Sequence, residues 1–558
     1  MITHSLPYGF ESVPSWGVLL TILVLTVVGL LIHDWILAWR MPPGPLPLPF
    51  IGNKLAIPKS APWIQFEKWS RIYGPVFTLW IGRRPTVVIS DPRIAGDLLE
   101  KRSNKYSSRP RFVVLGELYW DNASILVQQY NKQWQIRRKL LHQALSPSAL
   151  RLYKPVQEAE ATRLCHTLLS LPEAYESLVD RFASSVVFTV SYGHRVDSTD
   201  AQVVRRRLEF MQYSASLNVP GRFLVESLPI LKHIPNIFAP WKAEIQRRGR
   251  AEAAFNMGLV DVVRGEIRVD PKSVPDSLTK LLLQAREEDP EAFAILSERD
   301  FSFIPASLFG AGSDTTSSSM CSGILMLVTN PAVQEAAHAE LDAVVGTDRS
   351  PIFDDQKKLP YLDALISEIL RIRPVAVLGG TPHANSEPDD YQGYYIPKGS
   401  TILSNSWAIN LNERYYPNPH HFNPLRFLPG SIPPTSLTYL PSKYVASTSP
   451  EKGVDSHPSK DGHSSFGWGR RICPGAGLAR NSLFIAVAKL LWAFDILPVQ
   501  EPDGSIRSYD TFAYTEGFNI RPRPFECVIR ARSERHRAVL QEEMVYAKQV
   551  LEPFSPLR

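Results

Sequence analysis

The chain has 558 residues, 44% of them hydrophobic, which is enough for a large core and more than one average domain. Its 61 basic and 55 acidic residues nearly balance, which argues against a nucleic-acid-binding protein. Four cysteines without a C-x-x-C pair are too few for a disulfide framework. We therefore expect reduced thiols, and Cys165, Cys321 and Cys527 are expected to be small buried apolar residues.

An apolar segment near the N-terminus predicts a membrane anchor. Residues 16–32 carry no charge. With Trp35 and Trp39 they would make a helix of about 36 Å, against roughly 30 Å for a hydrocarbon core. A cleaved signal peptide is the alternative, but the segment is too long, no basic region precedes it, and no small-residue cleavage site follows. Glu11 before the span and Arg40 after it predict a luminal N-terminus and a cytosolic body.

The elements after the anchor begin with a stiff turn. Residues 41–53 are rich in proline and glycine and cannot continue a helix. Two β-rich runs, residues 76–82 and 85–90, predict a hairpin close to the membrane. From about Asp91 to Leu370 the pattern is mainly helical, and short β-like segments return in residues 391–405.

The C-terminal part predicts a loop and a tail. Residues 436–462 have the composition of a mobile loop, and the residues after about Arg532 predict a helix rich in charge. We expect a fold class that is mainly α with small β-sheets. The expected divisions are an anchor over residues 1–40, one catalytic body over residues 41–532 and a helical tail over residues 533–558.

The segment of residues 464–494 places Cys473 in a glycine-rich loop before an apolar helix. The helix N-terminus and nearby backbone N–H groups would lower the pKa of this thiol and favour the thiolate. Four glycines would let the backbone pass close to a flat ligand: Gly467, Gly469, Gly475 and Gly477. Phe466 could pack against that ligand. The residues alone predict an activated cysteine, with a buried structural cysteine as the alternative.

This segment resembles the haem-ligand signature of the cytochromes P450, F-x-x-G-x-R-x-C-x-G. The matching residues are Phe466, Gly469, Arg471, Cys473 and Gly475. Three further family motifs stand in the required order. They are W-x-x-x-R at Trp134 and Arg138, the oxygen-activation pattern at residues 311–316, and E-x-x-R at Glu368 and Arg371. The sequence of residues 378–397 is most similar to that of fungal family members that act in secondary metabolism.

The resemblance implies the cytochrome P450 fold with a single transmembrane helix in the endoplasmic reticulum and a catalytic body facing the cytosol. It implies haem b, with the iron axially ligated by the thiolate of Cys473. Residues implied to bind the cofactor are Trp134, Arg138, His383, Phe466, Gly469, Arg471 and Gly475, four of them as partners of the propionates. For His383, a histidine in a surface loop is the alternative.

Residues 310–319, GAGSDTTSSS, make a poor helix by propensity, and their composition alone favours a loop. The resemblance instead implies a long helix over about residues 301–328, with room for O₂ and water. Thr315 would then hydrogen-bond the oxygen being activated, and Asp314 would relay protons to it. The alternative for Asp314 is an ion pair with a surface base.

Other charged residues support two interpretations each. Glu368 and Arg371 share a helix face, and a surface salt bridge is the plain interpretation. By resemblance they form a buried triad with Arg426, although the usual glutamate of that motif is Leu425 here.

Arg137 and Lys139 lie on other helix faces than Arg138. They could belong to a basic docking patch for an acidic electron donor, and solvated charges are an equal alternative.

The expected function is that of a haem-thiolate monooxygenase that inserts one oxygen atom of O₂ into a lipophilic small molecule. Electrons would come from NADPH through NADPH–cytochrome P450 reductase, with cytochrome b5 as an optional second donor. One alternative is a haem-thiolate isomerase or dehydratase that does not use O₂. The intact Asp314–Thr315 pair argues against it. The other alternative is a haem-free membrane binding protein.

Overall fold

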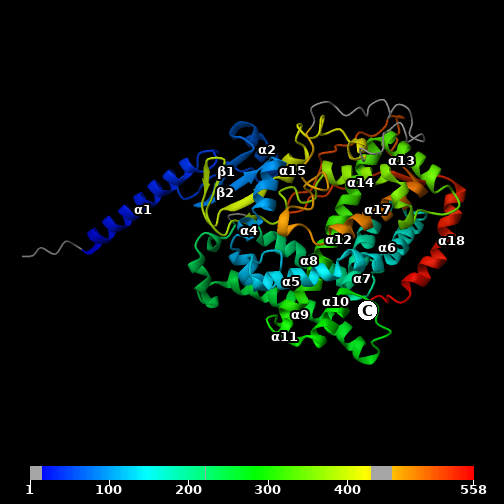
Figure 1. The fold of residues 1–558 in the computed structure, drawn as a ribbon, viewed down its shortest axis with the longest axis horizontal. Helices are drawn as coiled ribbons and strands as arrows, with labels where there is room; N and C mark the ends of the chain where they lie inside the picture. The colour runs from blue at the N-terminus through cyan, green and yellow to red at the C-terminus, as the bar shows by residue number, and fades with distance from the viewer. Residues whose placement is uncertain (1–14, 220–221, 429–454, 558) are drawn as a thin grey trace, which may run out of the picture.

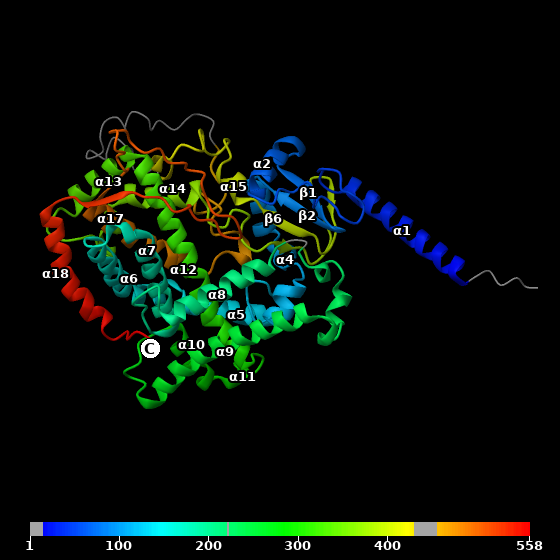
Figure 2. The same cartoon turned by 180° about the vertical axis from the view of Figure 1, so that it is seen from behind.

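A long helix, α12 (Glu298–Thr329), runs through the middle of the protein, and other helices pack around it (Figures 1 and 2). The structure is a computed structural model that describes residues 15–219, 222–428 and 455–557. A capping box of Ser297 and Asp300 begins α12, and most of its side chains are buried. The expected fold class, mainly α with small sheets, is confirmed.

The helices of the body fall into long and short ones. The long ones besides α12 are α2 (Pro62–Tyr73), α5 (Lys132–Ala144), α6 (Pro147–Leu168), α7 (Tyr175–Tyr192), α8 (Gln202–Leu217), α9 (Pro240–Val269), α10 (Leu278–Glu288), α13 (Pro331–Val344), α14 (Pro360–Ile372), α17 (Ala476–Ala493) and α18 (Glu534–Leu551). The short ones are α3 (Pro92–Ala95), α4 (Ser103–Tyr106), α11 (Pro290–Phe293) and α15 (Ser406–Asn410). The largest buried core joins α6, α7, α12, α14 and α17.

The main sheet joins distant parts of the chain. Its strands lie in the order β1 (Val76–Ile81), β2 (Arg84–Ile89), β6 (Thr401–Ser404) and β3 (His383–Ala384). β1 and β2 form the predicted hairpin, with Val76 opposite Ile89, and β2 pairs in parallel with β6. Two smaller sheets are antiparallel pairs: β4 (Asp389–Tyr391) with β5 (Tyr394–Ile396), and β7 (Phe494–Leu497) with β8 (Val528–Ala531).

The predicted anchor is a helix, α1 (Ser15–Arg40), that projects from the body (Figure 1). It is long and apolar enough to cross a membrane, and its apolar window is not buried in the protein. The body holds its C-terminal end through an ion pair between Arg83 and Asp34 (2.6 Å) and through Arg40 above the ring of Tyr395. α17 is also long and apolar enough to cross a membrane, but it is largely buried, so it is a core helix. Glu11 lies outside the described residues.

The predicted C-terminal helix is α18, and it packs along α6. Val156 and Ala159 of α6 form a buried cluster with Met544 and Ala547 of α18. The tail is thus in contact with the body, and the division at residue 533 stays a prediction. Of the predicted loop at residues 436–462, residues 455–462 contain no helix or strand, and the rest lies outside the described residues.

Candidate active site

Cys473 lies in a tight loop that ends where α17 begins. Its backbone N–H donates to the carbonyl oxygen of Phe466 (2.8 Å), which closes the loop, and the Phe466 side chain is half-buried. Gly469 has a φ of +56°, and a Cβ on it would lie 2.0 Å from the carbonyl oxygen of Leu99. Gly469 is therefore required for contact between two protein segments. Gly475 is beside the sulfur, since its Cβ would lie 3.9 Å from the Cys473 Sγ.

The thiol of Cys473 is accessible, although protein atoms surround it. It is exposed, whereas Cys165 and Cys321 are buried and Cys527 is half-buried. Burial among protein atoms raises the pKa of Cys473. The backbone N–H groups of Gly475 and Ala476 and the charge of Arg138 lower it but do not outweigh the burial. The expected net lowering is therefore wrong for the free thiol.

Three arginines and a histidine gather beside this loop. Arg138 of α5 donates to the carbonyl oxygen of Ile472 (2.6 Å). Arg471 donates to the carbonyl oxygens of Ser107 (2.7 Å) and Gln128 (2.8 Å). Its guanidinium carbon lies 4.1 Å from the ring centre of the buried Trp134. The motif residues Trp134, Arg138 and Arg471, far apart in sequence, are thus brought together.

The third arginine, Arg109, was not predicted from the sequence. It is buried, and its Nη1 donates to the carbonyl oxygens of Thr381 (2.6 Å) and Pro382 (3.0 Å), directly before His383. Burial and the charge of Arg138 lower the pKa of Arg109 to about 9. Burial, Arg109 and Arg138 lower the pKa of Arg471 to about 8.

The cluster of Arg109, Arg138 and Arg471 has no acidic partner. Within the described ranges, none of the three forms an ion pair with a carboxylate, and all their hydrogen bonds go to carbonyl oxygens. Arg109 is buried, and Arg138 and Arg471 are half-buried. Cations removed from water repel one another and are normally paired. This donor set therefore fits a ligand that carries two carboxylates, as haem does.

His383 is buried on β3 and is not a surface residue. Its Nδ1 bonds the carbonyl oxygen of Tyr106 (2.8 Å), so this nitrogen carries the hydrogen. Burial first, and then the charge of Arg109, lower the pKa of His383 to about 3. The neutral ring leaves Nε2 as an acceptor. His383 can donate to a propionate only as an imidazolium, which the negative charge of that propionate would favour.

Arg137 has a different place from the one expected. It is buried, its Nη2 pairs with Asp300 at the start of α12 (2.5 Å), and its Nη1 donates to the carbonyl oxygen of Ala123 (2.6 Å). Both interpretations of Arg137, as part of a docking patch and as a solvated charge, are wrong. Lys139, two residues further along α5, is exposed.

Residues 310–319 are helical throughout, as part of α12, and the loop favoured by composition is wrong. Two features overcome the poor propensity. A Cβ on Gly312 would lie 2.5 Å from a methyl carbon of Val187, so this glycine lets α7 approach closely. The hydroxyls bond carbonyl oxygens one turn earlier, as Thr315 does to Ala311 (2.8 Å) and Ser319 to Thr315 (3.0 Å).

Accessible positions in this part of α12 are Ala311, which is exposed, and Gly312, Asp314 and Thr315, which are half-buried. Most of the helix around them is buried. The carboxyl group of Asp314 accepts a hydrogen bond from the Nδ2 of Asn519 (2.7 Å). Burial raises the pKa of Asp314 against the opposing effects of Asn519 and Arg521. Asp314 forms no ion pair with a surface base among the described residues.

Glu368 and Arg371 form a buried pair. Both side chains have an exposed fraction of 0%, and the contact is bidentate, at 2.6 and 2.7 Å. Arg426 lies 3.7 Å from the Glu368 carboxylate, as the predicted triad requires. The surface salt bridge is therefore wrong. The missing acidic residue at Leu425 leaves this arrangement intact.

The family model for cytochrome P450 matches residues 42–522. A cytochrome P450 monooxygenase of Postia placenta is 36% identical over 88% of this chain and 89% of its own length. One of Armillaria gallica is 33% identical over 90% and 92%, respectively. The monooxygenase patI of Penicillium expansum is 33% identical over 92% and 93%.

The chain is a cytochrome P450. Its relatives are named as monooxygenases, so this cytochrome P450 is an oxidoreductase that incorporates oxygen from O₂. The family implies a haem cofactor with thiolate ligation, and the loop and the arginine cluster fit that group. Family membership decides against the haem-free binding protein, and the relatives give no support to an isomerase or a dehydratase.

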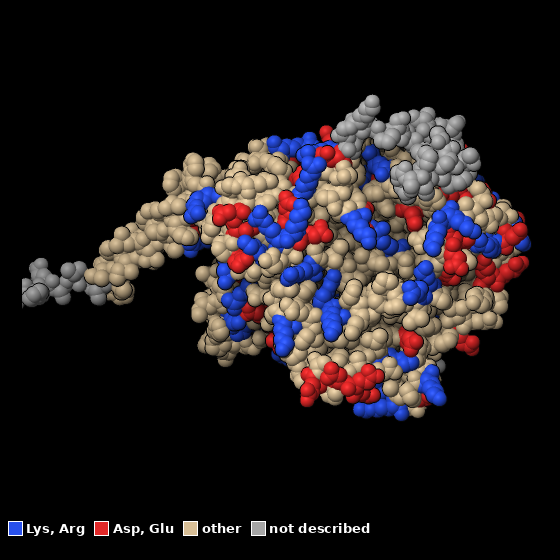
Figure 3. Space-filling view, in the orientation of Figure 1, with Lys and Arg blue, Asp and Glu red and all other residues tan. Residues whose placement is uncertain are grey.

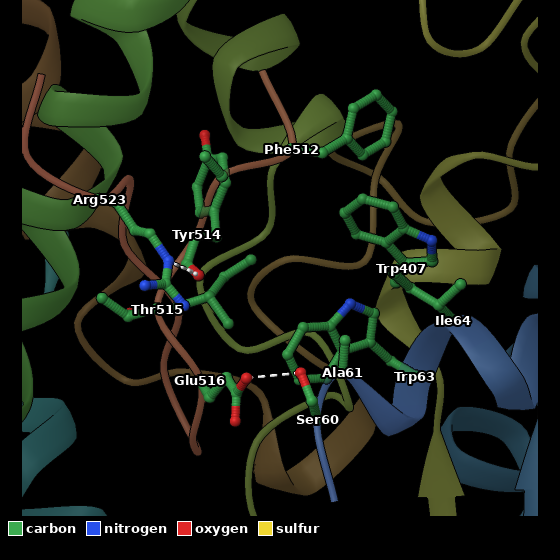
Figure 4. Close-up of a pocket in the computed structure, with 12 residues that line it drawn as sticks. Ser60, Ala61, Trp63, Ile64, Trp407, Phe512, Tyr514, Thr515, Glu516 and Arg523 are labelled. Atoms are coloured by element: carbon green, nitrogen blue, oxygen red, sulfur yellow. Dashed lines mark hydrogen bonds between the residues drawn. The ribbon is translucent and has the colours of Figure 1, made fainter. Parts of the chain in front are cut away.

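The cytochrome P450 has a hollow that is separate from the cysteine loop. It opens between the start of α2 and the segment of residues 512–523, and Trp63, Trp407, Phe512 and Arg523 are among its lining residues (Figure 4). The Oγ of Ser60 donates to Glu516 (2.5 Å) across its rim. Neither Cys473 nor any residue of α12 lines this hollow.

Proposed function

We propose that this cytochrome P450 hydroxylates a lipophilic small molecule in fungal secondary metabolism, with electrons from NADPH through a reductase. The balanced reaction is RH + O₂ + NADPH + H⁺ → ROH + H₂O + NADP⁺. The observation that carries the proposal is the exposed Cys473 beside the cluster of Arg109, Arg138 and Arg471, which forms no ion pair with a carboxylate among the described residues. The role in secondary metabolism is supported by the sequence of residues 378–397 and by the fungal relatives.

The proposed cofactor site assigns a role to each residue. Cys473 would be the axial ligand of haem b, whose iron supplies the activation of O₂. Arg109, Arg138 and Arg471 would hold the two propionates, with Trp134 and His383 beside them. Phe466 and Gly475 would lie close to the sulfur. Gly469 would act through the shape of the loop, because its close contact is with Leu99.

Replacing Thr315 with alanine tests the proposed role of α12. The variant should fold and bind haem, because only a methyl group and the hydroxyl bonded to Ala311 are lost. Loss of the hydroxyl should impair proton delivery, an effect of about 10²–10⁴ in rate. NADPH oxidation should continue and end in peroxide, O₂ + NADPH + H⁺ → H₂O₂ + NADP⁺. The measurement is the ratio of product to NADPH consumed, with a known substrate.

A matched control is Ser319→Ala, which removes another hydroxyl from the same helix. Ser319 is buried one turn further on and bonds the carbonyl oxygen of Thr315. It should keep the normal ratio of product to NADPH. An unchanged ratio in Thr315→Ala at normal turnover would contradict the assignment of Thr315.

The reductase is proposed to approach the side of the cysteine loop. Exposed basic residues there are Lys132, Lys139, Arg151 and Arg470. Lysine and arginine side chains also gather over the middle of the face drawn in Figure 3, where α5 lies in Figure 1. A basic surface suits an acidic electron donor, and cytochrome b5 would use the same complementarity.

We propose that α1 anchors the protein in the endoplasmic reticulum with the body in the cytosol. Deleting residues 1–39 should release much of the protein from membranes and leave haem binding intact. Release should be incomplete, because large apolar side chains of the body are also exposed, among them Leu46, Leu55, Ile237 and Phe238. Membrane pelleting combined with a haem spectrum measures both effects. A glycan on Asn122 of the intact protein would contradict the topology.

A further inference from the structure

The C-terminal hairpin of residues 514–522 reaches the acidic residue of α12. Its Asn519 donates from Nδ2 to the Oδ2 of Asp314 (2.7 Å). The backbone of the hairpin is closed by the N–H of Thr515 on the carbonyl oxygen of Arg521 (2.7 Å). We propose that Asn519 is a positioning residue that holds the Asp314 carboxyl group for proton delivery. This inference rests on the proposed role of Asp314.

The position of Asn519 is defined by the two residues that follow it. The N–H of the next residue, Ile520, donates to the carbonyl oxygen of Val375 (2.9 Å), and its side chain is buried. Arg521 then pairs with Asp180 of α7 (2.6 Å). Asn519 therefore lies next to two fixed contacts, and its amide can hold Asp314 in one orientation.

The chemistry of an amide suits a group that must gain and lose a proton. Asn519 carries no charge, so its hydrogen bond favours the carboxylate without the strong hold of a guanidinium. A nearby guanidinium, that of Arg521, pairs with Asp180, and Glu176 lies further away at 3.8 Å. Asn519 donates a hydrogen bond to Oδ2 of Asp314. The described residues donate no hydrogen bond to Oδ1 of Asp314. Oδ1 is thus the oxygen free to exchange a proton with water.

The charges around Asp314 predict the direction of the effect. Burial raises the pKa of Asp314, Asp180 acts in the same direction, and Asn519 and Arg521 oppose them. Cys321 of α12 contacts Arg521 through its sulfur (3.3 Å) and is itself held neutral by burial, which raises its pKa to about 12. Removing the Asn519 amide should therefore raise the pKa of Asp314 and move its titration to higher pH.

The test compares Asn519→Ala, Asp314→Asn and the double variant in full-length, haem-loaded protein. The first readout is the infrared band of the Asp314 carboxyl, identified by its loss in Asp314→Asn and titrated against pH. In Asn519→Ala its midpoint should lie at higher pH. The second readout is the rate of product formation, which should fall roughly 10-fold to 100-fold, together with oxygen consumption, as expected for a misplaced catalytic group. In the Asp314→Asn background, Asn519→Ala should add no further loss.

A matched control is Tyr514→Phe. The hydroxyl of Tyr514 bonds Ser322 (3.1 Å), so it joins the same hairpin to the same helix without contacting Asp314. Its infrared midpoint should equal that of the parent protein. An unmoved midpoint in Asn519→Ala, or a loss that adds to that of Asp314→Asn, would overturn the positioning role. If Asp314→Asn itself keeps the normal rate of product formation, the proposed role of Asp314 fails, and the inference fails with it.

Discussion

Replacing Cys473 with alanine is expected to leave most of the purified protein without haem and to abolish the thiolate spectrum. The sulfur is the proposed protein bond to the iron, and the arginine cluster can hold only the propionates. Cys473→His should keep part of the haem, with a shifted spectrum and little oxygenation. The measurements are haem per polypeptide and the difference spectrum of the reduced, CO-bound protein.

The control for this prediction is Cys527→Ala. The Cys527 thiol is half-buried next to β8, and burial raises its pKa to about 12, so it is a neutral packing group. Its loss should leave the spectrum unchanged. If Cys473→Ala kept both the thiolate spectrum and turnover, Cys473 could not be the ligand.

Glu368→Ala is expected to be the most destabilising single change outside the cysteine loop. It would leave the guanidinium of Arg371 fully buried without its carboxylate, at a cost of about 3–5 kcal/mol. The same carboxylate accepts the backbone N–H of Asn423 (2.9 Å), so that loop should loosen too. Because typical domains are stable by only about 5–15 kcal/mol, we expect little soluble haem-loaded protein. Urea unfolding followed by fluorescence measures the loss.

A matched control is Glu244→Ala. Glu244 and Arg247 have the same i, i+3 spacing and a bidentate contact, but both side chains are exposed on α9. Water replaces such a contact, so the unfolding midpoint should stay that of the parent protein. Equal stability of Glu368→Ala and Glu244→Ala would show that burial of the pair does not matter.

Local patterns in the sequence predicted much of this protein. A long uncharged segment predicts α1, because apolar length is a property of the segment itself. The two β-rich runs predicted the hairpin of β1 and β2, since a tight turn joins neighbouring residues. The spacing around Cys473 predicted the loop, and W-x-x-x-R predicted Trp134 and Arg138 as neighbours of Arg471.

Tertiary packing alone decided the rest. Composition favoured a loop at residues 310–319, but the segment is helical. At Gly312 the close approach of α7 requires a residue without a side chain. Arg137 and Arg138 look alike in sequence, yet one is buried against Asp300 and the other reaches the cysteine loop. Arg109 cannot be told from Arg111 by spacing, although Arg111 is an exposed partner of Glu117.

Asn519 is the clearest example of a residue whose place local sequence patterns could not predict. Nothing near it in the sequence marks it, and its partner Asp314 lies in another part of the chain. Propensity and periodicity act over a few residues, so they determine which segments are helices, strands or anchors. Burial, charge pairing and hydrogen bonds between distant segments depend on which surfaces meet in the folded protein. These contacts, and with them the chemistry available to Asp314 and Arg109, follow from the tertiary structure alone.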